Sequence, residues 1–304
     1  MPAPGRFGAV LTAMVTPFDD QGRLDLDAAV RLARWLVDNG NDGLVVAGTT
    51  GEAPVLTDEE KLDLWRAVAG AVTVPVIAGA GTNDTRHSIE LTRRAQETGA
   101  AGILAVTPYY SRPPQAGLAH HFRAVAGATR LPVMIYDIPV RTGRKVAHET
   151  LLGLAREVDN IVAVKDAASD VAGSARLLAG APSGFELYSG EDGLNLALLA
   201  VGASGVVSVA AHWSGALHAE MVASFAKGDV DGARAANARL LESFAFETGE
   251  AAPNPIPAKA MLRVLGHRVG ECRPPMGPAP AGLEDRARAV LANLGPDAPL
   301  PVPG

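Results

Sequence analysis

The chain alternates short apolar runs with longer segments whose apolar residues recur at helical spacing. An apolar run at residues 8–15 and then a helically spaced segment at 26–37 predict a strand followed by a helix. This unit repeats, with glycine or proline turns before the later apolar runs. The predicted strands are residues 8–15, 43–47, 75–78, 102–106, 132–136, 161–165, 185–188 and 205–209. The predicted helices between them are residues 26–37, 58–71 with Asp58 as its cap, 84–98, 115–128, a helix from about 148, 168–179 and 194–201.

Strands that alternate with helices at this spacing indicate parallel pairing, and strands that are apolar on both faces indicate that both faces are covered. Eight such units close best as an α/β fold of the (β/α)8 TIM barrel type. A doubly wound open sheet is the alternative, but no Gly-x-Gly-x-x-Gly follows the first strand.

After residue 209 the pattern predicts helices only, at residues 216–226, 230–246, 257–265 and 283–294. We therefore predict a catalytic barrel at residues 1–226 and a C-terminal helical extension at 227–294. The proline-rich residues 295–304 cannot continue a helix, and we expect them to be disordered. No low-complexity linker separates the barrel from the extension.

Composition excludes several classes of partner. The 304 residues are 48% apolar and 20% charged, and the formal charge of −6 gives no basic field for nucleic acid or anionic membranes. Cys272 is the only cysteine, which excludes an intramolecular disulfide and a cysteine-rich metal site and suits a reducing cytoplasm. No signal peptide, long apolar span, His-x-x-x-His motif or carboxylate cluster stands out, so we expect a cytoplasmic protein with a small-molecule site and no metal.

Lys165 is unusual because it ends the apolar run at residues 161–165. Burial of an ammonium group costs several kcal/mol unless the group is paired or loses its proton, and desolvation lowers a lysine pKa by up to about 3–5 units. A neutral amine is a nucleophile. The alternative is a salt-bridged or solvent-reaching lysine, but Asp166 is a poor partner because successive strand side chains point to opposite faces.

In a barrel of this type the active site lies at the carboxyl ends of the strands. Polar residues follow the strands at residues 48–52 (GTTGE), 107–110 (TPYY), Tyr136 with Arg141, Lys165, 189–192 (SGED) and Ser208. Tyr136 and Lys165 end neighbouring strands, which places a phenol near an amine. Arg141 is either a solvated loop charge or a carboxylate clamp. Glu191 and Asp192 open the helix at 194–201, and we interpret them as structural.

Seven motifs carry a family resemblance: TAMVTPF at 12–18, GTTGE at 48–52, TPYYSRP at 107–113, YDIPVRTG at 136–143, VAVKDA at 162–167, SGED at 189–192 and NPIP at 254–257. Together they resemble the dihydrodipicolinate synthase and N-acetylneuraminate lyase family of class I pyruvate-dependent aldolases, over about residues 8–294. Arg141 resembles the synthase branch, because the sialic acid and ketodeoxysugar aldolases lack that arginine.

The resemblance implies a Schiff-base mechanism without cofactor or metal. Lys165 would attack the ketone of pyruvate, and the resulting enamine would add to the aldehyde of L-aspartate 4-semialdehyde, a step of lysine and diaminopimelate biosynthesis. Tyr136 would be the acid and base, relaying protons through Thr49 to Tyr110 from a neighbouring subunit.

The resemblance also implies the binding residues and the assembly. Thr50 would hold the pyruvate carboxylate, and Arg141 would hold the carboxylate of the second substrate. Gly190 and Val207 would line the pocket through their carbonyl oxygens. The family habit is a homotetramer built as a dimer of dimers.

The chain departs from the relatives that lysine inhibits, which use an asparagine and a glutamate on the third helix and histidines near the start of the second. Asn83 is kept, but His87 stands at the glutamate position, and Asp58 and Lys61 stand at the histidine positions. A cationic Lys61 and a missing carboxylate disfavour a cationic amino acid, so we expect weak or absent lysine feedback.

Two other functions remain alternatives. A sister aldolase would cleave a 2-keto-3-deoxy sugar acid or sialic acid, and Arg141 argues against it. A catalytically silent barrel acting as a ligand sensor would lack a catalytic residue, whereas Lys165, Tyr136, Thr49 and Tyr110 are all present.

Overall fold

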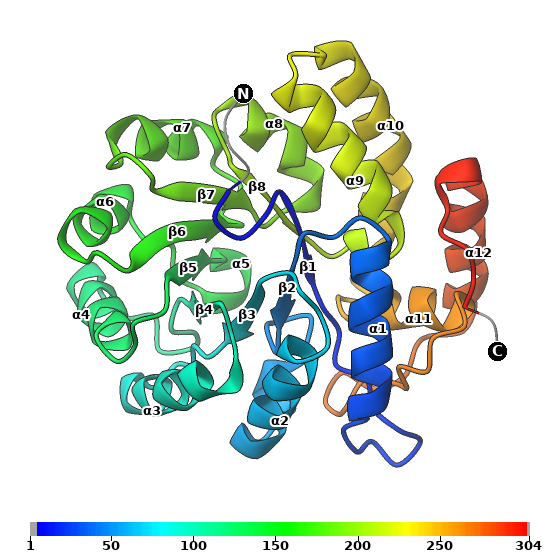
Figure 1. Cartoon of the computed structure of the whole chain (residues 1–304), viewed down its shortest axis with the longest axis horizontal. Helices are drawn as coiled ribbons and strands as arrows, with labels where there is room; N and C mark the ends of the chain where they lie inside the picture. The colour runs from blue at the N-terminus through cyan, green and yellow to red at the C-terminus, as the bar shows by residue number, and fades with distance from the viewer. Residues whose placement is uncertain (1–4, 303–304) are drawn as a thin grey trace.

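The computed structural model describes residues 5–302, whose centre is a closed barrel of eight parallel strands (Figure 1). The barrel closes where β8 pairs with β1. The strands are β1 Val10–Ala13, β2 Gly43–Val46, β3 Val76–Gly79, β4 Gly102–Val106, β5 Val133–Asp137, β6 Ile161–Asp166, β7 Glu186–Ser189 and β8 Gly205–Ser208. The predicted (β/α)8 barrel is confirmed, and the doubly wound open sheet is excluded.

Helices surround the barrel between successive strands (Figure 1). They are α1 Leu26–Asp38, α2 Asp58–Ala69, α3 Thr85–Ala95, α4 Gln115–Ala126, α5 Pro139–Thr142, α6 His148–Glu157, α7 Val171–Gly180 and α8 Asn195–Ala200, with the 3-10 turns η1 Ala53–Val55, η2 Gln96–Thr98 and η3 Asp192–Leu194. The short α5 was not predicted, because four residues are too few to show helical periodicity.

The start of α2 differs from the prediction by one residue. Thr57, not Asp58, caps the helix: its hydroxyl accepts from the Glu60 amide at 3.2 Å, and the Glu60 carboxylate accepts from the Thr57 amide at 2.9 Å. This reciprocal capping box satisfies two amides that would otherwise lack partners.

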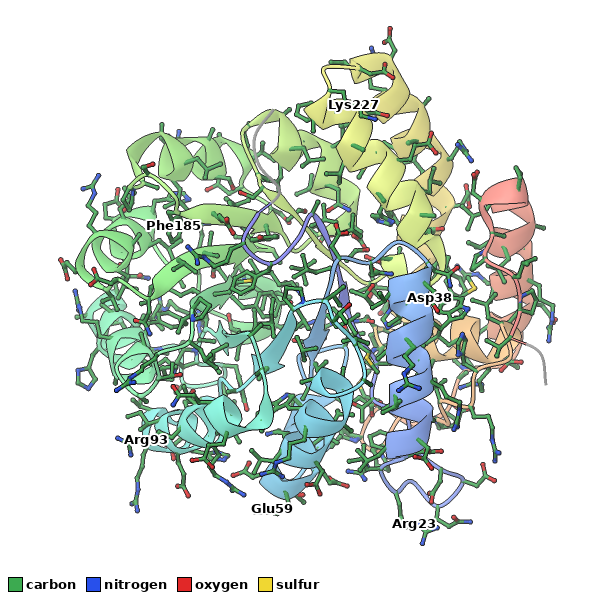
Figure 2. All side chains as sticks on the ribbon, viewed as in Figure 1. Arg23, Asp38, Glu59, Arg93, Phe185 and Lys227 are labelled. Carbon is green, nitrogen blue, oxygen red and sulfur yellow. The ribbon has the colours of Figure 1, made fainter. Side chains whose placement is uncertain are left out.

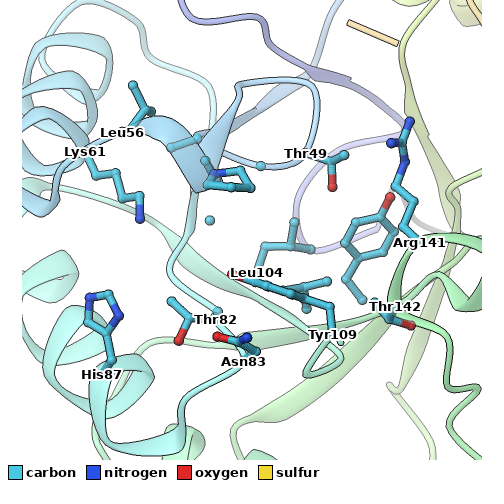
Figure 3. Close-up of a pocket in the computed structure, with 18 of the residues that line it drawn as sticks. Thr49, Leu56, Lys61, Thr82, Asn83, His87, Leu104, Tyr109, Arg141 and Thr142 are labelled. Carbon is cyan, nitrogen blue, oxygen red and sulfur yellow. The ribbon is translucent and has the colours of Figure 1, made fainter. Parts of the chain in front are cut away.

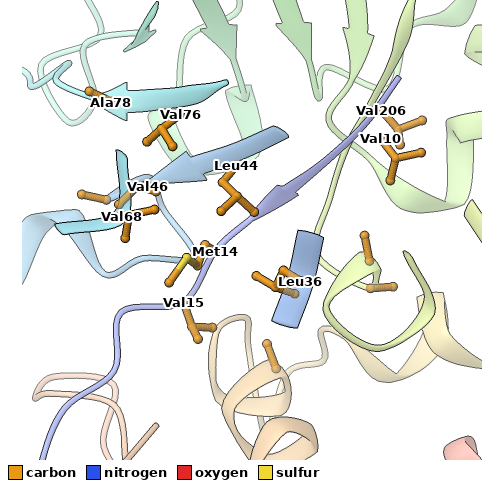
Figure 4. Packing of buried hydrophobic residues seen from close by; sticks show 14 of the residues in the cluster. Val10, Met14, Val15, Leu36, Leu44, Val46, Val68, Val76, Ala78 and Val206 are labelled. Atoms are coloured by element: carbon orange, nitrogen blue, oxygen red, sulfur yellow. The ribbon is translucent and has the colours of Figure 1, made fainter. Parts of the chain in front are cut away.

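Alternate residues of the strands enter two separate apolar clusters. Val10, Leu44 and Val76 pack outward against the helices, where Figure 4 shows them around Leu36 of α1. The residues between them, such as Leu11 and Val45, fill the barrel interior. This alternation follows from the two-residue repeat of a strand. It assigns each strand-end side chain either to the interior or to the helical layer.

The C-terminal extension is not a separate body. Its helices α10 Val230–Phe246, α11 Ile256–Val264 and α12 Leu283–Leu294 follow the long α9 Ala211–Ala226 and gather beside α1 (Figure 1). Leu240 of α10 and Leu262 of α11 belong to the same buried cluster as the outward residues of the strands. The extension therefore shares the core of the barrel.

Many charged side chains lie on the outside of the molecule, although several are buried, among them Lys165 and Lys259. Figure 2 shows Arg23, Glu59, Arg93 and Lys227 near the edge of the molecule and Asp38 at the end of α1, and all five are exposed. No helix within residues 5–302 combines the length and the apolar character that crossing a membrane requires.

The proline-rich tail has more order than the composition predicted. Residues Gly295–Asp297 form the 3-10 turn η4, and the Val302 amide donates to the Leu265 carbonyl at 2.9 Å. Proline ends α12 as expected, but the segment after it packs back on the extension. Residues 303–304 of the tail lie outside the described residues.

Gly79 provides a test of how closely the barrel packs around the loop after β2. A Cβ on Gly79 would lie 2.2 Å from the Ala47 carbonyl oxygen, whereas a Cβ on Gly193 would meet nothing within 4 Å. We predict that Gly79→Ala lowers the free energy of unfolding by about 1–3 kcal/mol or more. Urea denaturation checks this, with Gly193→Ala as the control. Equal midpoints for the two variants would contradict the packing described here.

Candidate active site

Tyr136 and Lys165 meet at the carboxyl ends of β5 and β6. The two residues are directly paired in the strand register, and the Lys165 ammonium lies 4.3 Å from the centre of the Tyr136 ring. Both side chains are buried, with 4% exposure for Tyr136 and 5% for Lys165. Ala163, two residues before Lys165, belongs to the interior cluster, so strand alternation directs Lys165 inward. The structure therefore brings together the phenol and the amine as the sequence predicted.

Asp166 points the other way. Its carboxylate accepts hydrogen bonds from the Ser174 hydroxyl of α7 at 2.6 Å and from the Ala168 amide at 2.9 Å. Asp166 therefore does not neutralise Lys165, as strand alternation predicted. The salt bridges formed within residues 5–302 do not include Lys165 either.

The environment of Lys165 favours its neutral form. Burial lowers the pKa of the amine from 10.5 to about 8, the nearby Asp192 carboxylate partly offsets this, and the Arg141 guanidinium lowers it further. An amine with this pKa is partly unprotonated near neutral pH, which a nucleophile requires.

Burial has the opposite effect on the pKa of the Tyr136 phenol. Burial raises its pKa to about 12, although Arg141 and a hydrogen bond with Thr49 act to lower it. The phenol therefore keeps its proton at neutral pH and can donate it to a developing charge beside Lys165.

Thr49 and Thr50 lie in the GTTGE loop after β2. Thr50 is 3% exposed, and its hydroxyl accepts a hydrogen bond from the Asn254 amide nitrogen at 2.9 Å. This contact leaves the Thr50 hydroxyl proton free to point toward an anionic oxygen. Asn254 comes from the segment between α10 and α11, 204 residues further along the chain.

Gly190 directly follows β7 beside the lysine stem, and Val207 lies in β8. A Cβ on Gly190 would lie 2.9 Å from both Cγ and Cε of Lys165, so only glycine leaves the lysine stem in place. Val207 is 2% exposed and its side chain belongs to the interior cluster with Tyr136.

A cavity of about 530 Å³ opens at this end of the barrel. Thr49 and Arg141 stand at one side of it, and Lys61 and His87 stand at the other (Figure 3). Tyr136 and Tyr110 also line it, whereas its described lining does not include Lys165, Thr50, Gly190 or Val207. Tyr136 thus contacts both the open cavity and the lysine. The side chain of Tyr110 is 91% exposed in the single chain.

Comparisons with known proteins identify the family of the chain and confirm its fold. The family model described as "Dihydrodipicolinate synthetase family" matches residues 6–294. The chain belongs to the dihydrodipicolinate synthetase family. A 4-hydroxy-tetrahydrodipicolinate synthase of Acidothermus cellulolyticus is 54% identical over 96% of this chain and 94% of that protein. Another from Moorella thermoacetica is 49% identical over 95% of this chain and 99% of that protein.

Solved structures of dihydrodipicolinate synthases show the same fold. The lysine-bound enzyme from Cyanidioschyzon merolae has a TM-score of 0.93 at 42% identity, covering 96% of this chain and 99% of that one. The enzyme from Bacillus anthracis has a TM-score of 0.90 at 42% identity, covering 94% of this chain and 98% of that one.

In this member of the dihydrodipicolinate synthetase family, Asp192 lies in a buried hydrogen-bond network. The sequence predicted only that its carboxylate would favour the N-terminal end of a helix dipole. Asp192 is 3% exposed, and its carboxylate accepts from the Ser208 hydroxyl at 2.8 Å and from the Val209 and Ala210 amides at 2.9 Å. Burial alone would raise the pKa of Asp192, but contacts with His218 and these donors hold it below its usual range. The partners of Asp192 come from the end of β8 and the loop after it, and the Asn195 side chain of α8 also donates to its carboxylate at 2.9 Å.

Asn254 is a second polar residue that sequence reasoning did not place at the site. The NPIP motif that contains it contributed to the family resemblance, but nothing local indicated a contact with Thr50. The Asn254 carbonyl oxygen also accepts from the Arg141 guanidinium at 3.4 Å. Asn254 therefore links two candidate binding residues.

The pKa of Lys165 predicts how its reactivity depends on pH. Below pH 8 the neutral fraction falls about tenfold per unit, so we expect the rate of imine formation with pyruvate to rise with pH and level off above about 8. The measurement is borohydride trapping across pH, with the adduct located by peptide mass. Lys61, another buried lysine, serves as the internal control and should stay unlabelled. A midpoint near 10.5, or an adduct at another lysine, would refute this interpretation.

Proposed function

We propose that the chain is a 4-hydroxy-tetrahydrodipicolinate synthase, which condenses pyruvate with L-aspartate 4-semialdehyde through an imine on Lys165. The observation that carries the proposal is the pairing of the buried Lys165 amine with the Tyr136 phenol at the rim of the barrel. The names of the relatives from Acidothermus cellulolyticus and Moorella thermoacetica support the same activity.

The proposed reaction begins with attack of the Lys165 amine on the ketone carbon of pyruvate, and loss of water leaves an imine. The cationic nitrogen of the imine acidifies the methyl group, whose proton departs to give an enamine. The enamine carbon bonds to the aldehyde carbon of the semialdehyde, and the aldehyde oxygen becomes a hydroxyl. The semialdehyde amine then attacks the imine carbon, the bond to Lys165 breaks, and the ring closes.

Tyr136 serves this sequence as proton donor and acceptor. Its high pKa keeps it protonated when water must leave, and its hydrogen bond with Thr49 provides a route by which the proton is replaced. Tyr110 completes the relay in our proposal, from a neighbouring subunit. The nearly full exposure of Tyr110 in a single chain supports a role at a contact between copies. We accordingly propose a homotetramer built as a dimer of dimers.

Thr50 and Arg141 bind the two carboxylates in this proposal, and the carbonyl oxygens of Gly190 and Val207 complete the pocket. The Asn254 contact, which directs the Thr50 hydroxyl proton outward, supports the first assignment. The position of Arg141 at the cavity beside Thr49 supports the second (Figure 3). We also propose a cytoplasmic location, because a single cysteine suits a reducing compartment.

Arg141 separates the synthase from a sister aldolase. We predict that Arg141→Ala lowers kcat/KM for the semialdehyde about 10- to 100-fold, since it removes charge-assisted hydrogen bonds of about 1.5–3 kcal/mol. Trapping of the pyruvate imine should remain within a few-fold of wild type. Coupled steady-state assays and borohydride trapping measure the two effects.

Arg144→Ala is the matched control for Arg141→Ala. Arg144 is nearby, but its guanidinium donates to the Arg112 carbonyl at 2.9 Å instead of facing the cavity. Equal losses in both variants would argue against a clamp. Faster release of pyruvate from a sugar acid than consumption of the semialdehyde would overturn the synthase assignment itself.

The side of the cavity that holds Lys61 and His87 is the basis for our prediction about feedback inhibition by lysine. His87 Nε2 lies 2.8 Å from an Asp58 carboxylate oxygen, and the Lys61 ammonium lies 3.9 Å from the other. Asp58 is therefore already engaged, and Lys61 would repel a second cation. Burial lowers the pKa of Lys61, but Asp58 acts in the opposite direction.

We predict that sub-millimolar lysine leaves the initial rate unchanged. The double variant Lys61→His/His87→Glu, which removes the cation and restores a carboxylate, should become more sensitive to lysine than wild type. Initial rates across a lysine titration check both statements. Clear inhibition of the wild-type enzyme in that range contradicts the prediction.

A further inference from the structure

A buried ion pair joins the C-terminal extension to the GTTGE loop. The Lys259 ammonium of α11 lies 2.7 Å from a Glu52 carboxylate oxygen, and the two side chains are only 1% and 2% exposed. The ammonium also donates to the Glu271 carbonyl at 3.0 Å and lies 4.1 Å from the centre of the Phe18 ring. Because removing one partner would leave an uncompensated buried charge, the two residues hold each other in place.

Glu52 fixes a strained stretch of backbone. Its φ is +56°, in the left-handed region that residues with a Cβ rarely adopt, and Ala47 at the other end of the loop also has φ +56°. Such conformations cost about 1–3 kcal/mol each and persist where surrounding contacts enforce them. The second Glu52 carboxylate oxygen accepts from the Arg273 amide at 2.8 Å. The Thr16 hydroxyl donates to the Gly51 carbonyl at 2.6 Å.

The extension contacts the same loop at a second point, through the Asn254 hydrogen bond to Thr50. Residues 254–273 therefore hold the loop at Thr50 and at Glu52, on either side of Gly51. Thr49, which contacts the Tyr136 phenol, directly precedes the first of these points. A shift of Glu52 would be transmitted to both threonines within a few residues of backbone.

We propose that Lys259 and Glu52 are positioning residues whose buried ion pair holds Thr49 and Thr50 in register with Tyr136 and Lys165. The inference rests on the proposed function, because it assigns the threonines to proton relay and pyruvate binding. Neither Lys259 nor Glu52 lines the cavity that the structure shows. Lys259 and Glu52 affect the reaction by fixing the position of the loop. Replacing either residue should therefore weaken pyruvate capture although Lys165 itself is intact.

The test compares Glu52→Gln, Lys259→Met and the double variant. Each is incubated with pyruvate and borohydride well below its unfolding midpoint, and the trapping rate is measured against pyruvate concentration. We expect each single variant to lower trapping at limiting pyruvate about 10- to 100-fold, mainly through a higher half-saturating concentration, since small misplacements of binding groups have effects of this size. The double variant, which buries no unpaired charge, should lose less than the product of the two single effects.

Met261→Ala is the control for general destabilisation, because Met261 is fully buried in the same helix and belongs to the outer apolar cluster. It should lower the unfolding midpoint and leave pyruvate trapping unchanged. If Glu52→Gln captures pyruvate with wild-type rate and half-saturation, the inference is overturned, whether or not Lys259→Met folds. If wild-type enzyme itself gives no adduct at Lys165, the proposed function fails instead.

Discussion

Placing an amine inside a closed barrel without a direct counter-ion is the constraint on which the site depends. The interior of the barrel is filled by apolar side chains, so Lys165 loses its hydration; the face of the Tyr136 ring lies beside it, and the Asp192 carboxylate offsets this loss only in part. This unfavourable environment lowers the pKa of the amine, as the nucleophile that we propose requires. Gly190 preserves it, because any side chain there would displace the lysine stem toward other surroundings.

Acidic groups near Lys165 act on its pKa, although the salt bridges formed within residues 5–302 do not include this lysine. Asp192 is buried and ionised, whereas burial and the Asp192 charge raise the pKa of the neighbouring Glu247 well above its ordinary value. Asp192, Glu247 and Glu191 all act to raise the pKa of the Lys165 amine, and they offset in part the lowering caused by burial and by Arg141.

Local pattern was sufficient to predict the barrel and the pairing of Tyr136 with Lys165, because strand order and strand alternation together fix which side chains meet. It could not predict the contacts that cross the chain. Asn254 meets Thr50, and Lys259 meets Glu52, across about two-thirds of the sequence. Hydrophobic periodicity carries no information about contacts between residues this far apart in the chain. A lysine in an apolar helix is compatible both with a solvent-exposed and with a buried side chain. The cap of α2 and the short helix α5 were not predicted because each depends on the residues of a single turn, which are too few to show a periodic pattern.

The dependence of the GTTGE loop on residues 254–273 also bears on when a newly made chain becomes an enzyme. Synthesis proceeds from the N-terminus, so all eight strands leave the ribosome before Asn254 and Lys259 do. Before residues 254–273 follow, the chain already carries Lys165 and Tyr136, but Thr50 lacks its Asn254 partner and Glu52 lacks its Lys259 partner. The eight strands alone therefore do not complete the pyruvate pocket that we propose, and the helical extension must pack onto them first.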